Sequence, residues 1–198
     1  MMKNISKSKK YQAILITGKD LFWRYGLKRV SIEEICKEAS VSKMTFYKYF
    51  PNKVDLAKQI LSDIMQEALQ QFKGVLESDN SFEQKVEQMM RMKMEGTKEL
   101  SAEFMNDIYK QPENGLLEFM QKHGHQLQKL FVDFLQQAKR TGDIRNDIKI
   151  DFIIYQMNKM TDTVNDAGLL SKYSSPNELI MENMRFFFYG LTCSKTVE

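Results

Sequence analysis

Residues 31–53, SIEEICKEASVSKMTFYKYFPNK, decide the fold of this chain, because they contain two short helical patterns separated by a tight break. Ser31 and Glu34 have the S-x-x-E spacing of a capping box, in which two side chains satisfy free backbone amides at the start of a helix. The sequence therefore predicts a short helix beginning at Ser31, whose apolar positions are Ile32, Ile35, Cys36 and Ala39.

The second pattern follows a break at residues 40–42. Ser42 is a suitable N-cap for a helix over residues 43–50. Pro51 ends that helix, since proline disfavours a helical residue before it. Two short helices joined by a tight turn and braced by a preceding helix form a helix-turn-helix.

Longer helices flank this motif. Residues 11–25 place apolar side chains on one face, and Gly26 can end that helix in a left-handed conformation. Asn52 can cap a following helix that keeps its apolar period for about 25 residues.

The segment KMTFYKYF, residues 43–50, interleaves cations, aromatics and a hydroxyl. Phe46 and Phe50, four positions apart, can face the core. The outward side chains are then Lys43, Thr45, Tyr47, Lys48 and Tyr49. Filling of a small core explains both phenylalanines equally well, but it does not explain the outward cations and tyrosines.

Charge is distributed unevenly along the chain. Residues 1–53 hold 12 Lys/Arg against four Asp/Glu, a net of +8, and the remainder holds 17 basic and 22 acidic residues, a net of −5. Such a basic head is typical of a module that binds a polyanion such as nucleic acid. A merely solvated basic tail would account for Lys3 to Lys10 alone.

Composition excludes several other classes. The 42% hydrophobic content of these 198 residues, with nine Gly and three Pro, is too apolar for a disordered chain. No apolar run approaches the roughly 20 residues needed to cross a bilayer, and no secretory signal follows the basic N-terminus. Cys36 and Cys193 give neither a disulfide framework nor a metal cluster. We expect a cytoplasmic protein with no membrane association.

Residues 14–56 resemble the DNA-binding domain of TetR/AcrR-type transcriptional regulators. The resemblance rests on Ile14-Leu15, Leu21-Phe22, Gly26, Ser31-Ile32, Ile35, Ala39-Ser40-Val41-Ser42, the segment TFYKYFPNK at 45–53, and Asp55-Leu56. Gly18 stands where the family generally has alanine, at a cost of about 1 kcal/mol in helix propensity. Ser40 replaces the usual turn glycine, which is tolerable if the turn needs no positive φ. Met44 replaces a small residue, so it can alter which bases are contacted.

The resemblance implies contacts to DNA, and the chemistry of the side chains supports them. We expect phosphate contacts from Ser31, Tyr47 and Lys53, and base contacts from Lys43, Thr45 and Lys48, with the Thr45 methyl suited to thymine. The complete predicted DNA-binding set is Ser31, Ser42, Lys43, Thr45, Tyr47, Lys48, Tyr49 and Lys53.

The second half also has helical periodicity throughout. Helices are predicted over about 82–100, 102–110, 114–140, 151–168 and 177–192, with a Ser81/Gln84 capping box before the first of them. The fold class is therefore all-α. We expect an N-terminal three-helix helix-turn-helix domain over residues 1–56. The resemblance implies a helical effector-binding and dimerisation domain over residues 57–198.

Methionines and aromatics make an apolar ligand pocket plausible in the second half, although ordinary core packing explains each of them separately. The candidate pocket residues are Met89, Met92, Met105, Tyr109, Met120, Phe131, Tyr155 and Met157. The final helix carries four consecutive aromatics, Phe186 to Tyr189, so one side must be buried against another helix or another subunit. The candidate dimer residues are Phe152, Met160, Met184, Phe187, Phe188 and Leu191; burial within one protomer is the alternative.

The sequence has no pattern for catalysis, and we expect neither an enzyme nor any cofactor or metal. His123 and His125, the only histidines, point to different faces of a helix. The expected function is that of a homodimeric repressor. It binds a palindromic double-stranded DNA operator and is released by a small, largely apolar effector. The alternative keeps the DNA contacts but gives the C-terminal domain a protein partner in place of a small molecule.

Overall fold

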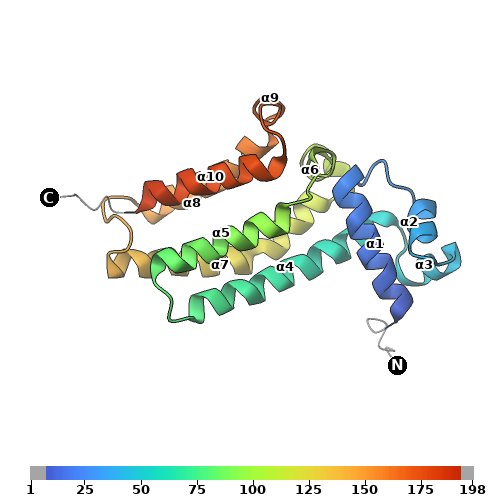
Figure 1. Ribbon diagram of the computed structural model, residues 1–198, viewed down its shortest axis with the longest axis horizontal. Helices are drawn as coiled ribbons and strands as arrows, with labels where there is room; N and C mark the ends of the chain where they lie inside the picture. Colours follow the sequence, from blue (N-terminus) through green and yellow to red (C-terminus); the bar gives the residue numbers. More distant parts are fainter. Residues whose placement is uncertain (1–7, 193–198) are drawn as a thin grey trace. The chain divides into compact units, whose positions relative to one another are not determined.

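The computed structural model describes residues 8–192, and helices make up most of that range (Figure 1). The predicted all-α class is confirmed: in this range an isolated bridge between Ile144 and Thr192 is the sole β-type pairing. The helices are α1 (Lys9–Tyr25), α2 (Ile32–Glu38), α3 (Lys43–Tyr49), α4 (Lys53–Glu77), α5 (Phe82–Thr97), α6 (Ala102–Tyr109), the 3₁₀ turn η2 (Pro112–Asn114), α7 (Leu116–Thr141), α8 (Ile150–Asn165), α9 (Ala167–Leu170) and α10 (Pro176–Leu191).

One predicted helix is interrupted. The span 151–168 divides into α8 and α9 because Asp166 has an extended backbone and its carboxylate accepts a hydrogen bond from the Leu169 N–H at 3.0 Å. Aspartate in this position caps a new helix. Within the described range, no helix is long and apolar enough to cross a membrane. Cys193, one of the two cysteines considered in the sequence, lies outside the described range.

The chain forms two compact units. The first comprises residues up to Gln66 together with Glu99–His123, and the second comprises Glu67–Lys98 together with the chain from Gly124 onward. The first unit is therefore larger than residues 1–56, because Phe104 and Ile108 of α6 are buried in the same core as the helix-turn-helix. The functional boundary at residue 56 stays a prediction.

The core of the first unit is built on aromatic side chains. Phe22 of α1, Phe46 of α3 and Phe104 of α6 are fully buried. The ring of Trp23 also packs on Phe104, with 4.6 Å between the centroids. At Gly18 an added Cβ would lie 2.8 Å from Leu56 Cδ2, so the glycine lets α4 approach α1 closely. Alanine at this position would therefore gain helix propensity but press on a buried leucine.

A buried carboxylate fixes the loop between α1 and α2. Asp107 of α6 accepts hydrogen bonds from the backbone N–H of Lys28 and from Gln111 Nε2, each at 2.9 Å. Gly26 ends α1 with φ +80°, and an added Cβ there would lie 2.7 Å from Asp107 Oδ2. The predicted glycine C-cap is confirmed, although its ψ of 158° lies outside the left-handed helical region. Only glycine combines that φ with room for the carboxylate.

The turn between α2 and α3 does require a positive φ. Ser40 has φ +53°, the Ser40 N–H donates to the Lys37 carbonyl at 3.2 Å, and the Val41 N–H donates to the Cys36 carbonyl at 2.9 Å. This is the Schellman arrangement that glycine usually completes. The condition under which serine would be tolerated without strain, a turn that needs no positive φ, is therefore not met, and a left-handed residue with a Cβ costs about 1–2 kcal/mol.

The second unit has its own core. It is formed by buried side chains of α4, α5, α7, α8 and α10, with Phe82 and Phe134 stacked at a centroid distance of 5.3 Å. Helices α5 and α10 lie side by side (Figure 1), and Asn177 Nδ2 joins them by donating to Met94 O at 2.9 Å and Thr97 Oγ1 at 2.8 Å.

Ser40→Gly should stabilise the protein by about 0.5–1 kcal/mol and raise its Tm by roughly 2 °C. The substitution removes the left-handed strain, and the greater freedom of glycine in the unfolded chain offsets part of the gain. Thermal unfolding followed by circular dichroism measures it. Ser40→Ala is the matched control and should give no gain, because it keeps the Cβ. Equal Tm values for the two variants would contradict the strain at this turn.

Candidate nucleic-acid interface

The exposed side of α3 is a single stripe of side chains. Phe46 is buried and Thr45 and Tyr49 are half-buried, whereas the remaining positions are exposed. Because residues four apart share a helix face, the exposed positions form one surface, which we call the α3 face: Lys43, Met44, Tyr47 and Lys48.

Serine caps hold the beginnings of α2 and α3. Ser31 Oγ accepts from the Glu34 N–H at 3.1 Å, and Ser42 Oγ accepts from the Thr45 N–H at 3.1 Å. The Ser42 and Thr45 hydroxyls also share a hydrogen bond of 3.0 Å. Both predicted N-caps are confirmed. The Glu34 carboxylate pairs with Arg29 at 3.4 Å, and that contact replaces the return half of the predicted capping box.

Lys43 is paired with an acid on the neighbouring helix. Its ammonium donates a hydrogen bond to Glu33 Oε1 of α2, and this contact raises the pKa of Lys43 and lowers the pKa of Glu33. Both side chains are exposed, so the pair contributes little stability and water or phosphate can exchange with it.

Lys53 supports the backbone before α2. Its Nζ donates to the carbonyl of Lys28 at 3.0 Å and to the carbonyl of Val30 at 2.7 Å. Partial burial lowers the pKa of this lysine. An ammonium has three donors, so these two bonds leave one for the predicted phosphate contact.

Tyr49 is turned toward α1 and away from the α3 face. Its hydroxyl donates to Ser8 Oγ at 2.9 Å, and its ring meets Tyr11 edge-on with 5.5 Å between centroids. Tyr11 in turn stacks on Phe50 at 5.3 Å. Tyr49 thus helps to attach α3 to α1. A DNA contact from Tyr49 stays a prediction.

The predicted DNA-binding residues all lie on or next to α2, α3 and the first turn of α4. The predicted DNA-binding set omitted Met44, which was noted only as a residue able to alter base contacts and whose side chain is 86% exposed. Its position four residues before Lys48 places both on one helix face, and that spacing is the signal by which sequence reasoning could have found it.

The predicted pocket residues are divided between the two units. In the first unit Met105 is buried and Tyr109 and Met120 are half-buried, and burial raises the pKa of Tyr109. In the second unit Met89 is buried, Met92, Phe131 and Met157 are half-buried, and Tyr155 is 57% exposed.

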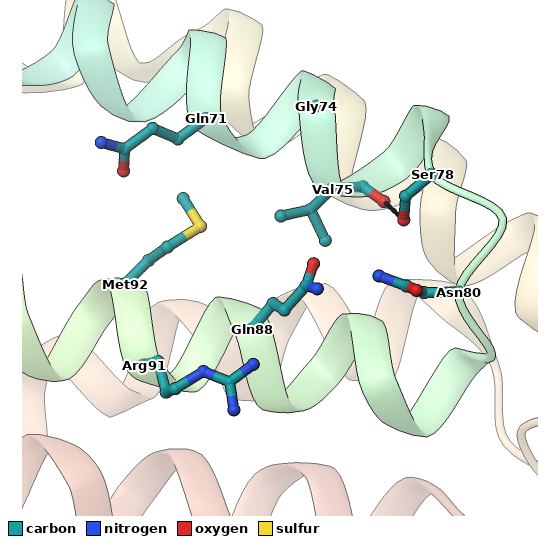
Figure 2. A pocket seen from close by; sticks show the side chains of 8 residues that line it. All are labelled: Gln71, Gly74, Val75, Ser78, Asn80, Gln88, Arg91 and Met92. Atoms are coloured by element: carbon teal, nitrogen blue, oxygen red, sulfur yellow. Dashed lines mark hydrogen bonds between the residues drawn. The ribbon is translucent and has the colours of Figure 1, made fainter.

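A groove of about 510 Å³ lies in the second unit between α4 and α5 (Figure 2). Figure 2 shows Met92 and Gln88 reaching from α5 toward α4. Met92 is the one predicted pocket residue in its lining. The complete lining is Gln71, Gly74, Val75, Ser78, Asn80, Gln88, Arg91 and Met92.

The predicted dimer residues differ in exposure. Phe188 and Leu191 are buried in the core of the second unit, and Met160, Met184 and Phe187 are half-buried. Phe152 of α8 is 50% exposed. The aromatics most open to a partner on α10 are Phe186 and Tyr189, at 85% and 75% exposure, and the prediction omitted both. Phe188 and Leu191 already pack inside the protomer, so they have little surface to offer a second subunit.

Residues 8–192 contain no group of three or more His, Cys, Asp or Glu that could hold a metal ion. His123 stacks on Phe119 with 4.1 Å between centroids, and its Nδ1 lies 2.8 Å from the Phe119 carbonyl. These contacts account for one of the two histidines as a packing residue.

Residues 14–60 match the family model of bacterial regulatory proteins, tetR family. The HTH-type transcriptional regulator YvdT of Bacillus subtilis is 36% identical over 75 residues, which are 38% of this chain and 39% of that protein. The HTH-type transcriptional repressor KstR2 of Mycolicibacterium smegmatis is 21% identical over 138 residues, 67% of this chain and 66% of that one. The chain thus matches less than two thirds of the length of either relative.

Solved structures share the fold along nearly the whole chain. The regulatory protein TetR from Rhodobacter sphaeroides superposes with a TM-score of 0.74 at 16% identity, covering 93% of this chain and 100% of that one. The fatty acid degradation regulator FadR from Bacillus halodurans gives a TM-score of 0.73 at 16% identity, covering 93% and 97%. These relatives are regulators and not enzymes. The helix-turn-helix, the match of residues 14–60 to the family model and the shared fold together support a regulator of the tetR type.

Proposed function

We propose that this regulator is a repressor that binds a palindromic operator in double-stranded DNA as a homodimer and is released by a small ligand in its second unit. The observation that carries the proposal is the α3 face, a row of cationic, phenolic and thioether side chains on a short helix with a buried opposite side. Likeness to the KstR2 repressor supports repression in preference to activation. DNA as the partner implies a cytoplasmic protein.

The α3 face has the chemistry for a major groove. The N-terminal residues of a recognition helix meet base edges, and flanking donors bind phosphates and fix the position of the protein on the duplex. Lys48 is exposed, and lysine favours guanine O6 and N7. Tyr47, 54% exposed and edge-on to Phe46, offers a stiff hydroxyl for a phosphate. The surplus of positive charge in residues 1–53 adds sequence-independent attraction.

A homodimer would cover the exposed aromatics of the second unit. Phe152 and Tyr155 of α8 and Phe186 and Tyr189 of α10 are each at least half exposed, which is a large apolar area for a monomer to leave in water. A two-fold axis through this surface presents two α3 faces, and two half-sites about 34 Å apart accept such a pair. This explains why the operator should be palindromic.

The groove between α4 and α5 is the ligand site that we propose. Met92 and Val75 provide apolar contact, whereas Gln88, Asn80 and the Arg91 guanidinium provide polar groups. A small ligand with an apolar body and one anionic end fits this lining, because a guanidinium binds carboxylates through paired hydrogen bonds. Likeness to a fatty acid degradation regulator agrees with that class.

Lys48→Ala should weaken binding to the operator about tenfold, because it removes a contact to a base edge. Fluorescence anisotropy with DNA from upstream of the protein's own gene measures the change, against a random duplex as competitor. Lys110→Ala removes the same charge at the end of α6 and should weaken binding to both duplexes only slightly. Equal losses in the two variants, on both duplexes, would mean that the basic charge alone is responsible.

Phe186→Glu should raise the dimer dissociation constant at least 30-fold, or about 2 kcal/mol, because it places a charge in the apolar interface. Sedimentation equilibrium measures the dissociation constant. Ile16→Glu alters another exposed apolar side chain, on α1 of the first unit and 61% exposed, and should leave the dimer intact. A Phe186→Glu protein that remains dimeric would place the interface elsewhere.

Gly74→Leu should abolish ligand binding, because Gly74 lines the groove and has no atom within 4 Å of an added Cβ. Dodecanoate, a monocarboxylate with a long apolar body, serves as the probe. At a hundredfold excess over Kd it should raise the Tm of the unaltered protein by about 5 °C. Gly96→Leu is the control, since Gly96 lies on α5, is equally open and does not line the groove. A Tm shift that Gly74→Leu retains would exclude this site, and no shift in any variant would exclude this ligand class.

A further inference from the structure

Among the described residues of the first unit, Met44 is the most exposed large apolar side chain. It is 86% exposed at the second position of α3, between two lysines of the α3 face. An isolated apolar side chain on a surface is ordinary. Here, however, it occupies the part of a recognition helix that meets base edges.

The neighbours of Met44 are engaged with the protein itself. Lys43 pairs with Glu33, and Thr45 shares its hydroxyl with Ser42 while half-buried. The Thr45 methyl, which the sequence suggested for thymine, is therefore poorly placed to reach a base. Among the first three residues of α3, Met44 has the apolar surface that is open to a partner.

We propose that Met44 determines part of the operator sequence by contacting the C5 methyl group of a thymine in the major groove. The inference rests on the proposed DNA-binding function and names a specificity-determining residue within it. The thymine methyl is the one apolar group that bases present in the major groove. The flexible, polarizable thioether of methionine adapts its shape to such a small target.

Lys48 predicts which base lies next to the thymine that Met44 contacts. It lies one turn after Met44 on the same face, so the two side chains reach neighbouring base pairs. Lysine favours the acceptors of guanine. The operator half-site should therefore contain a thymine close to a guanine, the first read by Met44 and the second by Lys48.

Replacement of thymine by uracil tests the contact, because uracil differs from thymine only by the missing methyl. Operators are first selected from a random-sequence duplex library with the unaltered full-length protein. Each thymine of the half-site is then replaced singly by uracil, and affinity is measured by fluorescence anisotropy. At one position the unaltered protein should lose about fourfold in affinity, the value for one buried methyl.

Variants assign that loss to Met44. Met44→Ala should bind the thymine operator about fourfold more weakly or worse and should show no further loss with uracil. Met44→Leu keeps the apolar surface, so it should still lose most of the fourfold affinity when thymine is replaced by uracil. Ile16→Ala, an exposed apolar control on α1, should behave as the unaltered protein does. Circular dichroism checks that every variant is folded.

The possible outcomes distinguish a failure of the Met44 contact from a failure of the proposed DNA-binding function. A uracil penalty that disappears in Met44→Ala and persists in Met44→Leu supports the contact. Selective binding with the same uracil penalty in Met44→Ala, or with none at any thymine, overturns the inference and leaves the regulator intact. A protein that selects no sequence from the library overturns the DNA-binding proposal and this inference together.

Discussion

A helix as short as α3 is not stable by itself. Packing against the rest of the first unit keeps it folded. Its seven residues are far fewer than the roughly 12–15 that an isolated helix needs in water. The Ser42 cap satisfies its first turn, and the burial of Phe46 and Phe50 fixes its inner side to the core. Because the inner side is fixed by packing, the α3 face is presented in one orientation, as base recognition requires.

The loop that leads into α2 is held at Lys28 and Val30 by side chains of two other helices. The N–H of Lys28 donates to Asp107 of α6, and its carbonyl accepts from Lys53 of α4. Asp107 comes from α6, and Lys53 comes from the first turn of α4. These charged side chains form hydrogen bonds with backbone groups of the loop, and such bonds are about twice as strong as those between neutral groups. The loop into α2 is therefore fixed by segments far along the chain.

Local patterns predicted the helices well. Ser31, Ser42 and Ser81 mark helix starts through short-range hydrogen bonds, and the Ser81/Gln84 capping box forms in full. Asp166 interrupted a predicted helix because one carboxylate offers a competing cap. The sign of φ at Ser40 could not be decided from the sequence, because serine gives no local sign of a left-handed conformation.

The candidate site was predicted from residue types, and the structure adds the contacts that its side chains make within the protein. Lys53 and Tyr49 have the chemistry of DNA contacts, but their partners are backbone carbonyls and Ser8, at separations in sequence that no local pattern reveals. Phe188 and Phe186 read alike in the sequence, yet one is buried and the other exposed, because the second unit covers only one side of α10.

Amide hydrogen exchange with and without operator DNA tests the central claim, that the α3 face is the surface on which this regulator binds its operator. Saturating operator should slow exchange most at residues 42–48 and at the start of α2, where the recognition helix and its neighbour meet the duplex. Unchanged exchange in these segments, with DNA bound and protection found only in the second unit, would contradict it.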